Sequence, residues 1–106
     1  APVTYPHFGN IPEFDTPAGI AVNSKGFVYV VESGKQRIHK FDDHGKLILS
    51  FGGERGTGSG QFNMPGTVNM PIGIAIDTED NVYVCDEDNH RVQKFDENGK
   101  FLMEIK

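Results

Sequence analysis

Cysteine, tryptophan and long apolar runs are rare or missing in this sequence. Cys85 is the only cysteine among 106 residues, which excludes an intrachain disulfide and a zinc site built from thiolates. It closes a short apolar run at residues 82–85, so we expect its side chain to be buried. No apolar stretch approaches the roughly 20 residues that span a bilayer, and we therefore expect no membrane partner.

A surplus of basic charge is also missing. The chain has 10 Lys and Arg against 15 Asp and Glu, which gives a net charge of −5, and its cations are spread along the sequence. An acidic surface repels phosphate backbones unless cations gather on one face. We therefore do not expect nucleic acid as a partner, and an RNA-binding face is kept only as an alternative.

What the sequence does contain is an internal repeat. Residues 17–22, PAGIAV, recur at 71–76 as PIGIAI, and residues 37–42, RIHKFD, recur at 91–96 as RVQKFD. A gapless alignment at this offset of 54 pairs residues 17–52 with 71–106 and holds 13 identical positions. Chance does not keep register over such a length, so the chain contains two copies of one structural unit.

Each copy predicts four short strands joined by tight turns, because 13 glycines and 6 prolines separate short β-branched runs. These runs are apolar on both faces of the pleat, which requires a sheet that is covered on both sides. A four-stranded blade stacked against identical neighbours in a propeller meets that requirement. The expected fold class is therefore all-β, with two four-stranded antiparallel propeller blades. In the first copy the expected strands span residues 19–23, 27–32, 37–42 and 46–51.

Residues 89–96, NHRVQKFD, resemble the signature of the NHL repeat, a family of β-propeller repeats. Residues 71–77 and 81–86 also match the family pattern in the same order, whereas the first copy departs from it with KQRI at 35–38 and with Asn23 in place of Asp. The resemblance covers residues 14–106 and implies two blades of a six-bladed type of propeller. It is specific for the fold and weak for the function, because propellers carry many activities.

The repeat divides the chain into four parts. Residues 1–13 form an N-terminal arm, which we expect to be an outer strand of a neighbouring blade, and residues 14–52 form blade 1. Residues 53–70 form an interblade loop with an insertion, and residues 71–106 form blade 2. Two blades alone leave apolar faces in water, so we expect the chain to bind copies of itself. Three copies joined head to tail would close a six-bladed ring, which predicts a homotrimer. The alternative is that the chain is a fragment of a longer propeller, stabilised by domain swapping or crystal contacts.

The interblade loop is the expected working part of the chain. The resemblance implies that the loop entering the first strand of a blade and the loop between its second and third strands open on one face. The segment 52–71 then shares a face with residues 32–36 and 86–90, and long loops of this kind often carry function. The candidate binding residues on this face are Glu32, Arg55, Asn63, Met64, Asn69, Met70, Asp86, Glu87 and His90.

Sequence patterns for catalysis are weak. The acidic triplet at residues 86–88 has oxygen ligands suited to Ca²⁺, but a capped turn is the preferred interpretation. No two of the four histidines share a zinc-binding spacing, so no cofactor is predicted, with Ca²⁺ or Zn²⁺ as the alternative. Arg37 and Arg91 recur at equivalent positions, which predicts a structural ion pair or a packed side-chain stem in each blade. We assign no catalytic residue and no metal ligand.

Three functions remain open. The preferred hypothesis is a non-catalytic NHL propeller scaffold that binds a protein or small ligand and assembles into a closed ring. The first alternative is a metal-dependent enzyme of the lyase or hydrolase type, since the family includes the lyase half of the peptide-amidating enzyme. The ligands and catalytic residues of that enzyme do not match this sequence. The second alternative is an RNA-binding NHL propeller.

Overall fold

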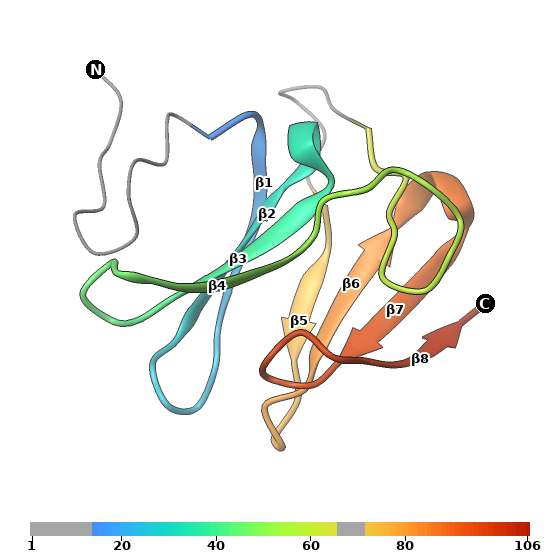
Figure 1. Ribbon diagram of the computed structural model, residues 1–106. Coiled ribbons are helices and arrows are strands. Elements are labelled where there is room, and N and C mark those ends of the chain that lie inside the picture. The colour runs from blue at the N-terminus through green and yellow to red at the C-terminus, as the bar shows by residue number, and fades with distance from the viewer. Residues whose placement is uncertain (1–13, 66–71) are drawn as a thin grey trace.

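The computed structural model describes residues 14–65 and 72–106, which form two four-stranded antiparallel sheets (Figure 1). The first sheet has the order β1-β2-β3-β4 and the second β5-β6-β7-β8, so sequential strands are neighbours throughout. The all-β class and the two four-stranded sheets are confirmed. The strands of the first sheet are β1 (Pro17–Val22), β2 (Val28–Glu32), β3 (Arg37–Phe41) and β4 (Leu47–Gly52). Those of the second are β5 (Ile74–Ile76), β6 (Val82–Asp86), β7 (Arg91–Phe95) and β8 (Phe101–Ile105).

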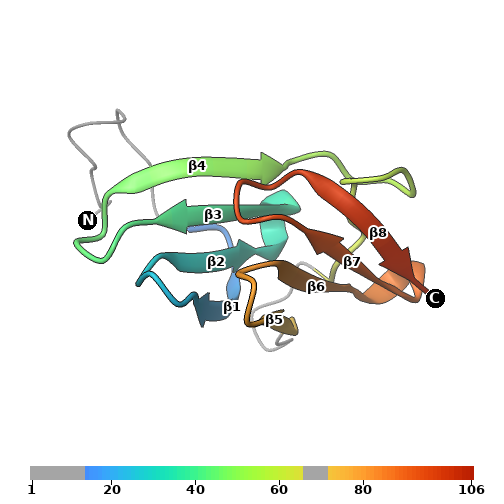
Figure 2. The same ribbon diagram turned by 90° about the horizontal axis from the view of Figure 1, so that it is seen from below.

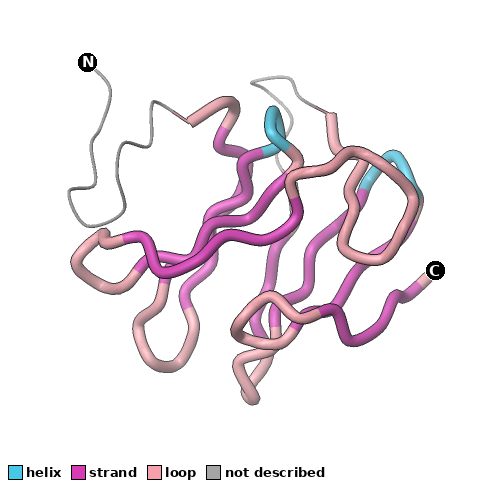
Figure 3. Tube along the Cα trace, in the orientation of Figure 1, coloured by secondary structure: helices cyan, strands magenta, loops and turns pink. Residues whose placement is uncertain are grey.

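Helical structure in the described residues is limited to two single 3-10 turns, η1 (Ser33–Lys35) and η2 (Glu87–Asn89). Each replaces the plain loop that the sequence predicts between the second and third strands of a sheet. Each ends at a residue with left-handed backbone, Gln36 with φ 56° and His90 with φ 54°, whose N–H donates back to the first residue of the turn. The two turns lie at the same end of the sheets (Figure 3). No helix in the described part of the chain is long and apolar enough to cross a membrane.

The four hairpin turns at the opposite end share one construction. The side-chain oxygen of the first turn residue accepts hydrogen bonds from the backbone N–H groups two and four positions later. Such a turn needs a short side chain with an acceptor oxygen, which explains the Asn or Asp that the sequence places there. The four residues are Asn23, Asp42, Asp77 and Asp96.

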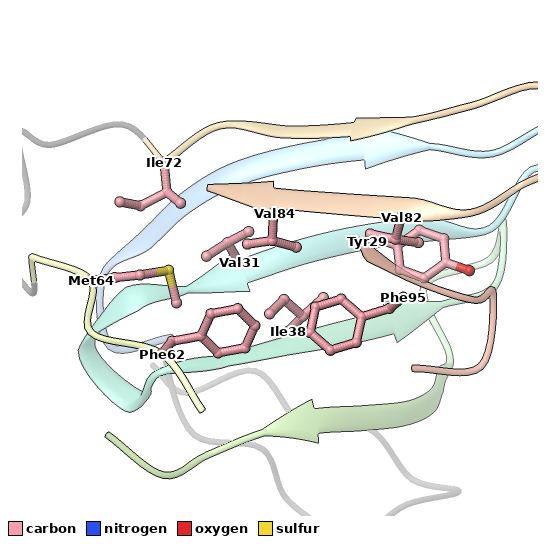
Figure 4. Close-up of a cluster of buried hydrophobic side chains, with 9 residues drawn as sticks. All are labelled: Tyr29, Val31, Ile38, Phe62, Met64, Ile72, Val82, Val84 and Phe95. Carbon is pink, nitrogen blue, oxygen red and sulfur yellow. The ribbon is translucent and has the colours of Figure 1, made fainter. Parts of the chain in front are cut away.

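The core lies between the two sheets, which stand side by side with the same strand order (Figure 2). The first sheet contributes side chains from β2 and β3, the second from β6 and β7, and the chain between β4 and β5 contributes three more (Figure 4). All are at most 3% exposed, so the cluster forms an interior from which water is excluded. The nine residues are Tyr29, Val31, Ile38, Phe62, Met64, Ile72, Val82, Val84 and Phe95.

Polar contacts close the hairpin end of this interface. The carbonyl oxygen of Glu97 accepts hydrogen bonds from the Tyr29 hydroxyl at 2.7 Å and from Lys40 Nζ at 3.0 Å. The Asp80 carboxylate accepts from the Ser24 backbone N–H at 2.9 Å and from its hydroxyl at 2.6 Å. Burial raises the pKa of Tyr29 to about 12, so its hydroxyl is a donor at neutral pH.

The expectation that Cys85 is buried is wrong. Its neighbours Val82 and Val84 point into the core, and Cys85 lies on the opposite face of β6, where it is exposed. The apolar run at residues 82–85 indicates a strand that is covered on both faces, but the structure covers only the face that packs against the first sheet. The same reasoning explains why Met103 and Ile105 of β8 are 45% and 46% exposed.

The core position Ile38 provides a test of this packing. Ile38 is completely buried, so we expect Ile38→Ala to lower the free energy of unfolding by about 2–5 kcal/mol through lost transfer energy and a cavity. Ile48 on the adjacent strand is 39% exposed, and Ile48→Ala should cost less than about 1 kcal/mol. Urea denaturation followed by circular dichroism measures both. Equal losses in the two variants would show that the core lies elsewhere.

Candidate functional site

The linker at residues 53–65 crosses the end of both sheets that carries the 3-10 turns (Figure 1). The backbone N–H of Gly53 donates to the carbonyl oxygen of Gln36 at 2.7 Å, beside η1. Farther along, the backbone N–H of Asn63 donates to Asp86 Oδ1 at 2.7 Å, and its carbonyl oxygen accepts from the Asp88 N–H at 2.9 Å, beside η2. The described part of the linker therefore shares one end of the molecule with both turns, as the sequence predicts.

The predicted binding residues divide into an exposed and a buried group. Arg55, Glu87 and His90 are exposed and Asn63 is half-buried, and Arg55 Nη1 donates to Asn63 Oδ1. We call these four residues the loop face. Glu32, Met64 and Asp86 are at most 2% exposed, so a ligand in solution does not reach their side chains. Asn69 and Met70 lie outside the described residues.

Asp86 is the centre of a buried polar cluster in the second sheet. Its Oδ2 accepts hydrogen bonds from Arg91 Nε at 2.7 Å, Asn89 Nδ2 at 3.0 Å and Gln93 Nε2 at 3.1 Å. Its Oδ1 accepts the N–H of Asn63, so four donors satisfy the carboxylate. The predicted structural ion pair of Arg91 is confirmed, and Asp86 is its partner. Within residues 14–65 and 72–106, no group of three or more His, Cys, Asp or Glu side chains is placed to hold a metal ion.

Arg91 also fixes the glycine-rich part of the linker. Its Nη1 donates to the carbonyl oxygen of Thr57 at 3.0 Å, and its Nη2 donates to those of Gly58 at 2.8 Å and Gln61 at 2.9 Å. Burial lowers the pKa of Arg91, but hydrogen bonds to Asp86 and Glu104 outweigh burial and raise it above its ordinary value. A planar guanidinium with five donors in a fixed geometry suits this role. The linker is thus anchored beneath the loop face by a charged side chain.

The first sheet contains a related cluster around Glu32. This carboxylate accepts hydrogen bonds from Arg37 Nε at 2.8 Å and from the backbone N–H of Asp15 at 2.7 Å, and it binds His39 Nε2 at 2.8 Å. The predicted ion pair of Arg37 is therefore confirmed as well. Burial raises the pKa of Glu32, but the bonds from Asp15, His39 and Arg37 outweigh burial and hold it below its ordinary value. Glu32 is thus ionised at neutral pH.

His39 extends this cluster to the surface. It is 2% exposed, and its Nδ1 lies 2.6 Å from the hydroxyl of Ser50, which is an exposed residue of β4. Ser50, His39 and Glu32 thus form a continuous chain of hydrogen bonds from the surface to a buried carboxylate. A serine, a histidine and a carboxylate in contact are the groups that activate a serine nucleophile in hydrolases.

Sequence reasoning did not find Ser50 and His39, although the repeat carries a signal. At offset 54 their counterparts are Glu104 and Gln93, whereas the acid and the arginine of the cluster are kept in both copies. Gln93 Nε2 donates to Asp86 as His39 binds Glu32, so the second sheet has the same framework without a nucleophile or a base. Positions at which the two copies of the repeat carry residues of different chemical type therefore indicate where the two blades differ in chemistry.

Glu32 makes stability depend on pH. Because the folded-state pKa of Glu32 lies below its value of about 4.3 in an unfolded chain, its stabilisation is present above that value and is lost as the pH falls through the folded-state pKa. We expect the Tm to fall between about pH 5 and pH 3, and to fall less steeply in Glu32→Gln. Thermal melts over this range measure the slopes. The exposed carboxylate variant Asp88→Asn should keep the wild-type slope, and an unchanged slope in Glu32→Gln would contradict the prediction.

Comparison with known proteins gives consistent matches to one repeat family. The sequence model of the NHL repeat matches residues 14–41 and 68–95. NHL repeat-containing protein 3 from human is 34% identical over 94 residues, which is 85% of this chain and 25% of that protein, and the mouse protein gives the same values. Protein brain tumor from Drosophila melanogaster is 36% identical over 47 residues, which is 43% of this chain and 4% of that protein. The chain spans about a quarter of the length of NHL repeat-containing protein 3.

Proposed function

Because this chain belongs to the NHL-repeat family, we propose that it is a non-catalytic propeller scaffold that binds a protein or small ligand on its loop face and joins copies of itself into a closed ring. The observation that carries the binding proposal is the construction of the loop face. Exposed polar side chains of mixed charge lie above a buried network in which Arg91 and Asp86 fix the supporting backbone.

A fixed backbone under exposed side chains favours binding. The linker that carries Arg55 and Asn63 is bonded to η2 and to Arg91, so few degrees of freedom remain to be lost when a ligand binds. Preorganisation of this kind raises affinity because it lowers the entropic cost of association. Arg55, Glu87 and His90 supply one cation, one anion and one titratable ring, a set that suits a polar peptide surface better than an apolar ligand.

The ring proposal rests on the uncovered faces of the two sheets. In the described residues, 14–65 and 72–106, each sheet packs against the other on one face, and its second face carries exposed apolar side chains such as Ile20 and Ile105. A head-to-tail contact between copies covers both faces, and rotation about a common axis closes the ring. Three copies of two blades give the six blades that the family resemblance implies. In such a ring the loop faces of all copies lie on one side, which multiplies the binding sites.

Ser50, His39 and Glu32 support a second candidate function, hydrolysis of an ester or amide. His39 protonated on Nε2 donates to the ionised Glu32 and accepts the proton of the Ser50 hydroxyl on Nδ1. The Ser50 oxygen then attacks the carbonyl carbon, the leaving group departs with the proton from His39, and water releases the acyl group from Ser50. This candidate corresponds to the hydrolase alternative but requires no metal.

The loop face can be tested with a selected ligand. Peptides chosen from a random display library against the wild-type chain should lose about tenfold or more in affinity when Arg55→Ala and Glu87→Ala are combined, because exposed anchors of an interface carry most of its energy. Isothermal titration calorimetry measures the Kd. The control combines His44→Ala and Lys46→Ala, which change exposed residues at the hairpin end. A greater loss in the control would show that the binding surface lies at the hairpin end. Strongly salt-dependent binding of single-stranded RNA would favour the RNA-binding alternative.

Covalent labelling tests the hydrolase candidate. A fluorophosphonate should modify Ser50, as located by mass spectrometry, and Ser50→Ala should abolish the labelling. His39→Gln, which reproduces the second sheet, should slow labelling by about 100-fold or more through loss of the base. Ser59→Ala, in the exposed linker, is the control and should label normally. A wild-type chain that does not react would reject this candidate and leave the scaffold proposal intact.

A further inference from the structure

We propose that the uncovered face of the first sheet is a socket for a second copy of this chain, and that Tyr83, Lys94 and Ile105 of that copy form the plug that fills it. The inference rests on the proposed ring assembly and identifies the side chains that make its contact. The socket consists of Ile20, Val22, Val28, Val30 and Phe41, of which Phe41 is only 5% exposed and contacts Phe14.

The contact between the two sheets of one chain is the template for this docking. Tyr29 of the first sheet lies beside Val82 and Phe95 of the second (Figure 4), and its hydroxyl reaches the carbonyl oxygen of Glu97 at 2.7 Å. Lys40 Nζ donates to the same carbonyl oxygen at 3.0 Å. The Tyr29 ring thus covers the apolar face of the second sheet. One main-chain carbonyl oxygen accepts hydrogen bonds from both the tyrosine hydroxyl and the lysine amine.

The socket is the copy of that apolar face at offset 54. Its counterparts in the second sheet are all buried or packed against the core, namely Ile74, Ile76, Val82, Val84 and Phe95. In the first sheet, by contrast, Ile20 is 68% and Val22 is 59% exposed. Beside them lies a pocket of about 260 Å³, lined by Phe14, Val28, Val30, Phe41, Asp42, Asp43 and Gly45. All of these residues except Phe14 have counterparts in the gapless alignment at offset 54. Phe14 takes the place of Phe62, because it contacts Phe41 as Phe62 contacts Phe95.

The outer face of the second sheet carries the matching plug. Tyr83 and Lys94 occupy the positions of Tyr29 and Lys40 and are identical to them. In a contact of the same geometry between two copies, Tyr83 and Lys94 donate to the carbonyl oxygen of Asp43, which is the counterpart of Glu97. This acceptor belongs to the main chain, so the change from Glu to Asp preserves it. In the single chain the Tyr83 hydroxyl donates to Asp77 Oδ2 at 3.0 Å, a bond that docking replaces.

Ile105 completes the plug as the counterpart of Phe51. The ring centroid of Phe51 lies 4.9 Å from that of Phe95, and the Phe51 ring passes directly over Gly99, where an added Cβ would come within 2.6 Å of it. The socket has Gly45 at the equivalent position, with nothing within 4 Å of where a Cβ would be. The space beside Gly45 is therefore open to an apolar side chain from a second copy.

An ion pair at the edge of the contact within one chain, which we call the charged rim, is not reproduced between two copies. Within one chain, Lys25 Nζ pairs with Glu97 Oε2 at 3.0 Å. The counterparts are Glu79 and Asp43, which are both acidic. Like charges at a rim weaken association without removing its apolar centre. The contact between copies is therefore weaker than the contact within a chain, and added salt strengthens it.

Two variants mixed together test the pairing. Val30→Glu places a charge in the socket and Tyr83→Ala removes the main plug residue, and both residues are half-buried in the single chain, so both variants should fold as judged by circular dichroism. Light scattering should give three times 11.7 kDa for the wild type and 11.7 kDa for each variant alone. An equimolar mixture should give twice 11.7 kDa, because only one intact socket meets one intact plug.

A substitution that strengthens assembly gives an independent test. Glu79→Lys restores opposite charges at the rim, so the concentration at which the assembly dissociates should drop several-fold at low ionic strength. The difference from wild type should vanish at about 1 M salt, where the Debye length is about 3 Å. Glu54→Lys makes the same change of charge in the exposed linker and is the control, which should leave the dissociation concentration closer to that of the wild type.

The possible results separate the two proposals. A wild-type chain that stays monomeric at every accessible concentration would overturn the ring assembly and the socket together. A trimer that tolerates both Val30→Glu and Tyr83→Ala would overturn the socket alone. Variants that assemble in the mixture beyond a dimer would do the same, because the pairing leaves one broken socket and one broken plug.

Discussion

Face-to-face packing of one four-stranded sheet on the next is the constraint on which this structure depends. The strands carry apolar side chains on both faces of the pleat, and a sheet of this kind is stable only when both faces are covered. Within the chain, Tyr29, Val31 and Ile38 of the first sheet cover Val82, Val84 and Phe95 of the second. The two remaining faces carry exposed apolar side chains such as Ile20, Val22 and Ile105. The proposed assembly is therefore a completion of the fold and uses the same kind of contact that already exists inside it.

The buried carboxylate and arginine pairs organise the other functional end. In each sheet a carboxylate at the end of the second strand pairs with an arginine at the start of the third, Glu32 with Arg37 and Asp86 with Arg91. The same carboxylate accepts a backbone N–H from the segment that precedes the first strand. Burying a charge is costly unless its hydrogen-bonding capacity is filled, and here several donors fill it. One charged group thus fixes two strands and the incoming chain, which gives the loop face its support.

The sequence predicted the architecture well and the site only in outline. Apolar patterning and turn residues such as Asp42 and Asp96 are local signals, so the strands and the turns could be predicted from them. The end at which the linker lies came from the family resemblance. Burial could not, because it depends on which face of a strand has a neighbour: Cys85 and Val84 belong to the same run, yet only Val84 is buried. The anchoring of the linker by Arg91 was also hidden, since the acceptors are backbone carbonyl oxygens that no residue type reveals.

Comparison of the two blades separates architecture from chemistry. Tyr29 lies where the first sheet meets the second, and the proposed ring would place the identical Tyr83 at the equivalent contact between copies. Positions with unlike residues follow a different logic. His39 and Ser50 face Gln93 and Glu104 across the repeat, although the framework around them is the same, so packing does not dictate the difference. Because the framework accommodates either residue, these side chains are available for function, and they are the positions at which the two blades of this chain differ in chemistry.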